Sequence, residues 1–162
     1  MSQVNLKRRS VLGLMQMHAD ILEELKRRRV IRSKNNPVGD YTEWLVSKKL
    51  GLKLASNSTT GFDGMDSKKV RYQIKGRRIT PNNKSRQLST IRNMSKKPFD
   101  FLIGVIYDQD YKVICAAQIP HKVVSEIASY RKYVNSHIMH LREGALQDER
   151  IKDLTRRLAS KI

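Results

Sequence analysis

The chain has little cysteine and no long apolar run. Its 162 residues include one cysteine, which excludes an intrachain disulfide framework and a zinc site built from several cysteines. Cys115 lies in an apolar run and is expected to be a small core residue. No stretch approaches the roughly 18 apolar residues that cross a bilayer, and residues 1–9 lead into no signal-peptide core. We therefore expect one packed domain, intracellular and cytoplasmic, with no membrane partner.

Acidic residues are also scarce, and unevenly so. Asp and Glu number 15 against 33 Lys and Arg, so the formal net charge is +18. Residues 67–97 contain no acid at all. The basic side chains of this segment are Lys68, Lys69, Arg71, Lys75, Arg77, Arg78, Lys84, Arg86, Arg92, Lys96 and Lys97. Such a cluster attracts a polyanion through counterion release and predicts a nucleic-acid partner. A merely solvated basic face is the alternative.

Motifs of two other enzyme classes are missing. Gly-x-Ser-x-Gly is absent and Cys115 has no basic neighbour in sequence, which argues against serine and cysteine hydrolases. His137 and His140 are three residues apart with no glutamate between them, so a zinc site is not predicted.

The first half of the chain alternates helical and strand-like segments. Apolar spacing predicts a helix over residues 10–29, which ends in a basic run. A loop at 33–36 is followed by Pro37 and Gly39, and a second helix is predicted over 40–50. Strands are then predicted at 52–56, 62–66 and 70–75, the last two forming a hairpin.

The second half predicts a further hairpin and several more helices. Residues 99–107 and 111–119 are rich in β-branched and aromatic side chains and are expected to pair. A short helix is predicted over 87–94, within a basic insert that is expected to be largely exposed. The remaining predictions are a helix at 120–134, a strand at 137–141 and an amphipathic helix at 148–160.

This order of elements indicates a mixed α/β fold, with a central β-sheet flanked by helices. We divide it into a basic N-terminal helix and linker (1–36), an α/β core (37–134) and a C-terminal strand and helix packed on that core (135–162). The basic helix and linker could alternatively be a helix-turn-helix element, although no second recognition helix precedes Pro37.

The predicted hairpin places polar side chains together. If residues 67–69 are its loop, Asp63 lies directly opposite Gln73, and Lys75 points the same way as Gln73. Asp66 is expected to face away from Asp63. Ile74, between Gln73 and Lys75, is expected to point into the opposite layer.

Glu43 on a helix, Gly61-Phe62-Asp63 on a strand and Gln73-Ile74-Lys75 on its neighbour resemble the PD-(D/E)xK nuclease superfamily, which has the restriction endonuclease-like fold. The resemblance covers roughly residues 37–134. Two positions depart from the family pattern: Phe62 stands in place of the proline, and Gln73 in place of the usual acid, as in the family's QxK branch.

The resemblance implies a metal-dependent endonuclease acting on DNA rather than RNA. Asp63, Gln73, the carbonyl of Ile74 and Glu43 would bind Mg²⁺, with Mn²⁺ able to substitute, and Lys75 would orient or deprotonate the attacking water. The side chains expected to bind nucleic acid are Arg71, Arg77, Arg78, Lys84, Arg86 and Arg92. A homodimer would supply the two sites that cutting both strands needs.

Alternatives remain at each position. Asp40 and Glu43 have the spacing of a capping box, Asp63 has the neighbours of a turn residue, and Lys75 with Gln73 could be the solvated side of an edge strand. A nucleic-acid-binding module of the same fold without catalysis is the alternative function.

Overall fold

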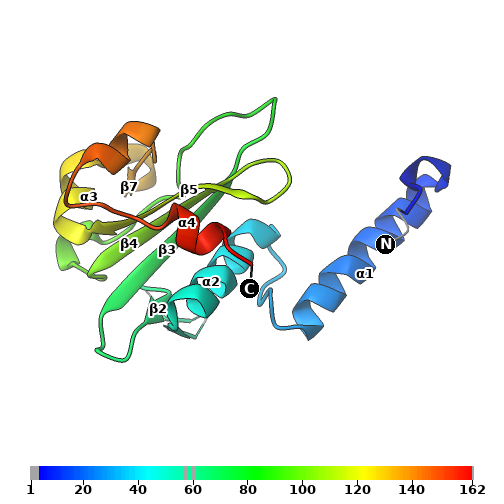
Figure 1. The fold of residues 1–162 in the computed structure, drawn as a ribbon, viewed down its shortest axis with the longest axis horizontal. Helices are drawn as coiled ribbons and strands as arrows, with labels where there is room; N and C mark the ends of the chain where they lie inside the picture. The colour runs from blue at the N-terminus through cyan, green and yellow to red at the C-terminus, as the bar shows by residue number, and fades with distance from the viewer. Residues whose placement is uncertain (1–3, 57, 60, 162) are drawn as a thin grey trace.

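The computed structural model describes residues 4–56, 58–59 and 61–161. Within them, a six-stranded sheet has the order β1-β2-β3-β4-β5-β8, with β3 and β4 parallel and the other neighbours antiparallel (Figure 1). Its strands are β1 (Lys53–Leu54), β2 (Gly64–Met65), β3 (Arg71–Arg78), β4 (Phe101–Tyr107), β5 (Val113–Pro120) and β8 (Lys152–Asp153). A two-stranded sheet pairs β6 (Ser129–Arg131) with β7 (Ser136–Ile138).

Helices surround the main sheet and extend from it. The α-helices are α1 (Val11–Arg27), α2 (Pro37–Leu50), α3 (His121–Ile127) and α4 (Thr155–Ala159). Short 3₁₀-helices are η1 (Leu6–Arg8), η2 (Met94–Lys96), η3 (Lys132–Val134) and η4 (Glu143–Gln147). The predicted mixed sheet flanked by helices, with an additional N-terminal helix, is confirmed. Among the described helices, none is long and apolar enough to cross a membrane.

One face of the sheet is covered by α2 and α4. Leu45 and Val46 of α2 and Leu158 of α4 are buried against side chains of β3, β4 and β5. A Cβ added at Gly76 of β3 would lie 2.0 Å from the Thr42 hydroxyl oxygen. The glycine therefore lets α2 approach the strand closely, and this approach fixes α2 against the strand that carries Gln73.

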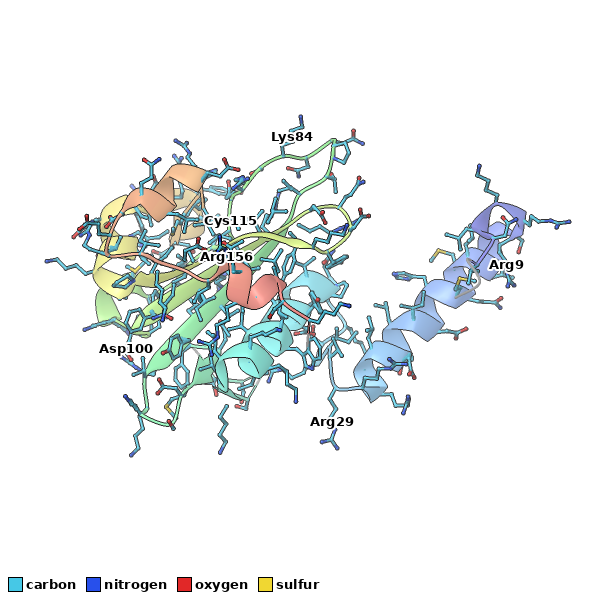
Figure 2. All side chains as sticks on the ribbon, in the orientation of Figure 1. Arg9, Arg29, Lys84, Asp100, Cys115 and Arg156 are labelled. Carbon is cyan, nitrogen blue, oxygen red and sulfur yellow. The ribbon has the colours of Figure 1, made fainter. Side chains whose placement is uncertain are left out.

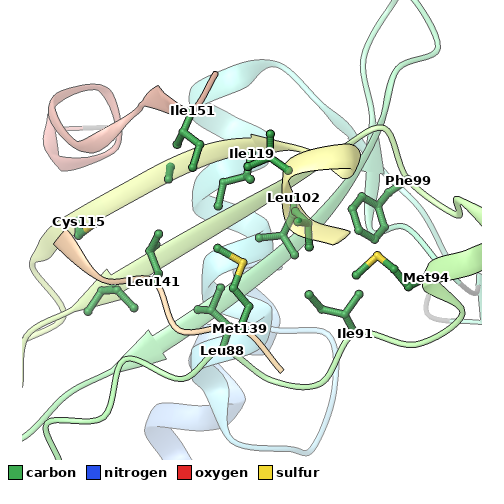
Figure 3. Close-up of a cluster of buried hydrophobic side chains, with 14 residues drawn as sticks. Leu88, Ile91, Met94, Phe99, Leu102, Cys115, Ile119, Met139, Leu141 and Ile151 are labelled. Atoms are coloured by element: carbon green, nitrogen blue, oxygen red, sulfur yellow. The ribbon is translucent and has the colours of Figure 1, made fainter. Parts of the chain in front are cut away.

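The other face is covered largely by loops. Leu88 and Ile91 of the connection between β3 and β4 are fully buried there, together with Met139 and Leu141 beyond β7 (Figure 3). Two valines of α3 complete this cluster. A parallel β3–β4 pair requires a crossover connection, and here that crossover is the basic segment itself.

That segment departs from the prediction. Residues 87–93 form no helix, because Gln87 bridges His140 and Ile91 bridges His137, and only Met94 belongs to a helical turn, η2. The amide of Leu88 donates to the carbonyl of Met139 at 2.9 Å. Tertiary pairing with the chain after β7 therefore overrides a local helical pattern. The insert is exposed around Asn82–Ser85 but contributes Leu88, Ile91 and Met94 to the core.

Two further helices are shorter than predicted. The expected helix over 120–134 ends at Ile127, because Ala128 is extended and the β6–β7 hairpin follows. The expected helix over 148–160 is reduced to Thr155–Ala159. Before it, β8 pairs with β5, and the side chain of Asp153 accepts a hydrogen bond from the amide of Thr155 at 2.7 Å. In both cases sheet pairing replaces part of the helix.

Helix α1 projects away from the rest of the molecule, with Arg9 at its far end and Arg29 near its base (Figure 2). The hydroxyl of Ser10 caps it by accepting from the amide of Gly13 at 3.1 Å. None of its residues is buried. The chain then turns at Arg29, whose φ is 58°, and Val30 and Ile31 anchor the next segment in the protein.

Candidate functional site

The hairpin of β2 and β3 has the predicted register. Gly64 lies opposite Tyr72 and Met65 opposite Arg71. Asp63 comes just before β2, and its amide donates to the carbonyl of Tyr72 at 2.8 Å. Asp66 turns away, as predicted: its Oδ1 accepts from the amides of the loop, and its Oδ2 accepts from the Tyr72 hydroxyl at 3.2 Å. Asp63, and not Asp66, is therefore the hairpin carboxylate that binds β3 next to Gln73.

Asp63 is held by the neighbouring strand. Its Oδ2 accepts a hydrogen bond of 2.7 Å from the amide of Ile74, which leaves the second carboxylate oxygen for another partner. Burial raises the pKa of Asp63, while the Ile74 amide, Lys75 and Arg32 lower it. Asp63 is thus a half-buried carboxylate whose charge is poorly solvated. A cation placed beside it would offset that cost.

The segment before Asp63 follows a constrained path. Gly61 has a φ of 99°, and a Cβ there would lie 2.6 Å from the Cβ of Pro98. A larger residue would meet both a strained backbone and a clash. The close approach of Pro98 joins the Asp63 strand to the end of the basic segment.

Gln73 is the most unusual residue of the site. Its side chain is only 8% exposed, and its Oε1 has no hydrogen-bond partner among the described residues. An unpaired buried carbonyl oxygen costs about 1–3 kcal/mol. Such atoms are rare in native proteins, where an ordered water, an ion, local strain or a functional role accounts for them. The orphaned oxygen belongs to the residue before Ile74, whose amide binds the Asp63 carboxylate.

Lys75 continues the same strand face. It is half-buried, lies in register with Gly104 of β4, and acts on the charge of Asp63. Ile74 between Gln73 and Lys75 points into the opposite layer, where it packs with α2. Gln73 and Lys75 therefore share one face of β3, and Asp63 is joined to that strand through the amide of Ile74.

Glu43 approaches this group from α2. Burial and the charge of Asp63 raise its pKa, while Arg32 lowers it. The capping-box alternative is wrong, because Asn36 caps α2 by accepting from the amide of Val38. The carboxylate of Glu43 instead forms an ion pair with the Nη2 group of Arg32.

Arg32 is a site residue that sequence reasoning missed. Its Nη1 donates to the carbonyl of Ala55 at 2.8 Å, just beyond β1. Its backbone amide donates to Oδ2 of Asp40 at 2.9 Å, so the acid assigned to a helix cap in fact holds the preceding loop. The available signal was a lone arginine between a basic helix and a helix bearing two acids. No sequence motif connects an arginine at this position with the acids of the following helix, so the sequence did not identify Arg32 as a site residue.

A pocket of about 210 Å³ joins Arg32, Glu43 and Asp63, whereas Gln73 and Lys75 do not line it. It is lined by Arg32, Asp40, Glu43, Phe62 and Asp63, with small polar residues around them. Among the described residues, no group of three or more His, Cys, Asp or Glu side chains gathers to hold a metal ion. Of the acids that line this pocket, Asp40 is engaged by backbone amides and Glu43 by Arg32, so any cation bound here would also need neutral oxygen ligands.

The predicted nucleic-acid-binding side chains divide into two groups. Arg71 is engaged by Asp100, which accepts from its backbone amide and its guanidinium, and this pairing lowers the pKa of Asp100. Arg86 pairs with Glu143 at 2.6 Å. Within the described structure, both therefore have protein partners that a phosphate would have to replace or share.

The remaining basic side chains are more accessible. Lys84 lies at the end of a long loop and is exposed, as is Arg92 (Figure 2). Arg77 donates to the carbonyl of Ser85 at 3.2 Å. Arg78 donates to the carbonyl of Gln109, and its guanidinium lies 4.9 Å from the centre of the Tyr111 ring. These contacts orient the two arginines of β3 without neutralising their charge.

Comparison with known proteins adds no assignment. No protein-family model matches the chain, and no curated protein matches it either.

Proposed function

We propose that this protein is a metal-dependent endonuclease of the PD-(D/E)xK type, in its QxK branch, which hydrolyses phosphodiester bonds of DNA. The observation that carries the proposal is the orphaned Oε1 of Gln73, which lies two residues before Lys75 on β3 and next to Ile74, whose amide binds the Asp63 carboxylate. The acid-free basic segment that connects β3 to β4 supplies the charge for a polyanionic substrate.

The donor set fits a hard divalent cation. Mg²⁺ prefers oxygen ligands from one or two carboxylates together with neutral oxygens and water. Asp63 and Gln73 would hold it, with the carbonyl of Ile74 and, through water, Glu43. Mn²⁺ would substitute for it. When bound, such a cation lowers the pKa of a coordinated water and offsets charge on the phosphate.

The protein's own groups would carry out the remaining tasks. Lys75 would orient the attacking water beside Asp63, whose negative charge it faces. Arg77 and Arg78 follow on the same strand and would hold phosphates next to the cleaved bond. Two copies acting on opposite strands would produce a double-strand break, and we propose an intracellular, DNA-bound location.

A second function has its own supporting observation. The site has few carboxylates, and one of them, Glu43, is already paired with Arg32. A nucleic-acid-binding module that has lost catalysis would show the same basic segment and tolerate this pairing. DNA cleavage would require Lys75, whereas DNA binding by a module without catalysis would not.

Cleavage of plasmid and single-stranded DNA tests the proposal. Wild type, Lys75→Ala and the control Lys122→Ala, an exposed lysine outside the basic segment, would be incubated with Mg²⁺, Mn²⁺ or EDTA at low and moderate salt. We expect metal-dependent product from wild type and from Lys122→Ala, and a loss of at least about 100-fold in Lys75→Ala. Gel shifts of all three proteins without product in either metal would instead support the binding module.

A further inference from the structure

Arg32 is fixed in place by the fold. The residues before it, Val30 and Ile31, are 9% and 5% exposed, so the chain enters the site from a buried anchor. The amides of Arg32 and Ser33 both donate to Oδ2 of Asp40, at 2.9 and 2.7 Å. The guanidinium is further held by the carbonyl of Ala55. Its position is therefore built from the α1–α2 connection, α2 and the end of β1.

Its charge acts on both carboxylates of the site. Arg32 is ion-paired with Glu43, and the two side chains are 28% and 19% exposed. Asp63 lies close enough for its charge to interact with that of Arg32. All three residues line the same pocket of about 210 Å³. A guanidinium in so small a space excludes a second cation from the carboxylate that it binds.

We propose that Arg32 is an internal cation that occupies Glu43 and limits this site to a single divalent ion, held at Asp63 and Gln73. The inference rests on the proposed function, because it concerns the same metal site. Coulomb repulsion between like charges in a half-buried pocket is much less screened than in water. Arg32 leaves Glu43 paired without metal, which avoids an uncompensated buried carboxylate.

Two variants separate this role from direct ligation by Glu43. In Glu43→Gln, the ion loses at most a contact made through water, and Arg32 loses its partner, so the affinity should fall by less than about tenfold and one ion should still bind. In Arg32→Gln, the like charge is removed and the Glu43 carboxylate is released. We expect divalent-ion affinity to rise on the order of tenfold, or a second ion to bind.

Titration with Mn²⁺ alone, followed by the electron paramagnetic resonance signal of free Mn²⁺, measures both affinity and stoichiometry on the full chain. The set is wild type, Arg32→Gln, Glu43→Gln and Asp63→Asn at one pH, with folding checked by circular dichroism. We expect one ion in wild type and in Glu43→Gln, and loss of binding in Asp63→Asn. If Arg32→Gln does not fold, the Glu43→Gln titration decides the question.

The outcomes distinguish the two proposals. Wild-type protein that binds no Mn²⁺ overturns the metal site and the role of Arg32 together. Wild-type binding that disappears in both Asp63→Asn and Glu43→Gln leaves the nuclease proposal standing and overturns the role of Arg32. Unchanged affinity and stoichiometry in a folded Arg32→Gln would overturn it as well.

Discussion

Gln73 shows how a single residue can be costly to the fold and useful to a site. Its buried Oε1 lacks a partner among the described residues, although replacement by an apolar side chain would remove that cost. The sequence predicted its position opposite Asp63, because strand alternation and a short loop determine register. It could not predict that the oxygen would be unpaired, since this depends on which side chains from other elements come near.

We expect Gln73→Met to stabilise the protein while removing the metal site. Met has a similar length and no buried amide, so the free energy of unfolding should rise by about 1 kcal/mol. Thermal and urea unfolding measure this change, and Mn²⁺ titration measures the loss of binding. The exposed control Gln109→Met should change neither. A loss of stability in Gln73→Met would show that the amide is satisfied in solution.

Replacing Gln73 by the family's usual acid should have the opposite effect on metal binding. Gln73→Glu adds a carboxylate beside Asp63, so we expect Mn²⁺ affinity to rise on the order of tenfold, with a loss of stability in the absence of metal because two like charges then meet. The comparison is made by titration and by unfolding with and without Mn²⁺. Weaker metal binding in a folded Gln73→Glu would contradict the assignment of this side chain as a ligand.

Two aspartates should give pH dependences of opposite sign. Burial raises the pKa of Asp63, so the folded state binds its proton more tightly than the unfolded state. The ionised form therefore reduces stability as pH rises from the ordinary Asp value through the raised one. Asp63→Asn should be more stable than wild type at neutral pH, with the difference shrinking as pH falls below that window.

Asp100 should make stability depend on pH in the opposite direction from Asp63. Arg71 lowers its pKa, so the stability that it contributes is present above the ordinary Asp value and is lost as pH falls through the lowered one. Asp100→Asn should be less stable than wild type at neutral pH and equal to it in acid. Urea unfolding at several pH values measures both variants, and the same sign for both would contradict the environments described here.

At the scale of elements, the sequence predicted secondary structure correctly where the chain pairs with its near neighbours in sequence. The hairpin of β2 and β3 and the hairpin of β4 and β5 were predicted because alternation and short turns specify them. Residues 87–94 were not, because their partners, His137 and His140, lie far along the chain. Arg32 was missed for the same reason: its partners Glu43 and Ala55 meet it only once α2 has packed on the sheet.

The packing of α2 on β3 should be sensitive to a single methyl group. In Gly76→Ala the new Cβ meets the Thr42 oxygen, so we expect a loss of about 1–3 kcal/mol in the free energy of unfolding. Thr42→Ala should relieve part of this cost, and a double-mutant cycle measures the coupling. Gly39→Ala, which meets nothing within 4 Å, is the control. Additive effects at positions 76 and 42 would argue against the close packing of α2.

At the scale of the whole molecule, a net charge of +18 makes DNA affinity depend on salt, and the structure separates basic residues by accessibility. Lys84 and Arg92 are exposed on the acid-free segment, whereas Arg9 lies at the far end of α1 (Figure 2). Removing one side chain that binds a phosphate should reduce the slope of log affinity against log salt by about 0.9 on duplex DNA. Fluorescence anisotropy at several salt concentrations measures this slope for each variant.

We expect the double variant Lys84→Ala/Arg92→Ala to reduce that slope by about 2, and Arg9→Ala to leave it unchanged. The reason is position: the long loop that carries Lys84 belongs to the crossover beside β3, while α1 extends away from the sheet. The opposite result, a slope reduced by Arg9→Ala alone, would place the DNA along α1 and favour the helix-turn-helix alternative. It would also separate binding from the hairpin that carries Asp63 and Lys75.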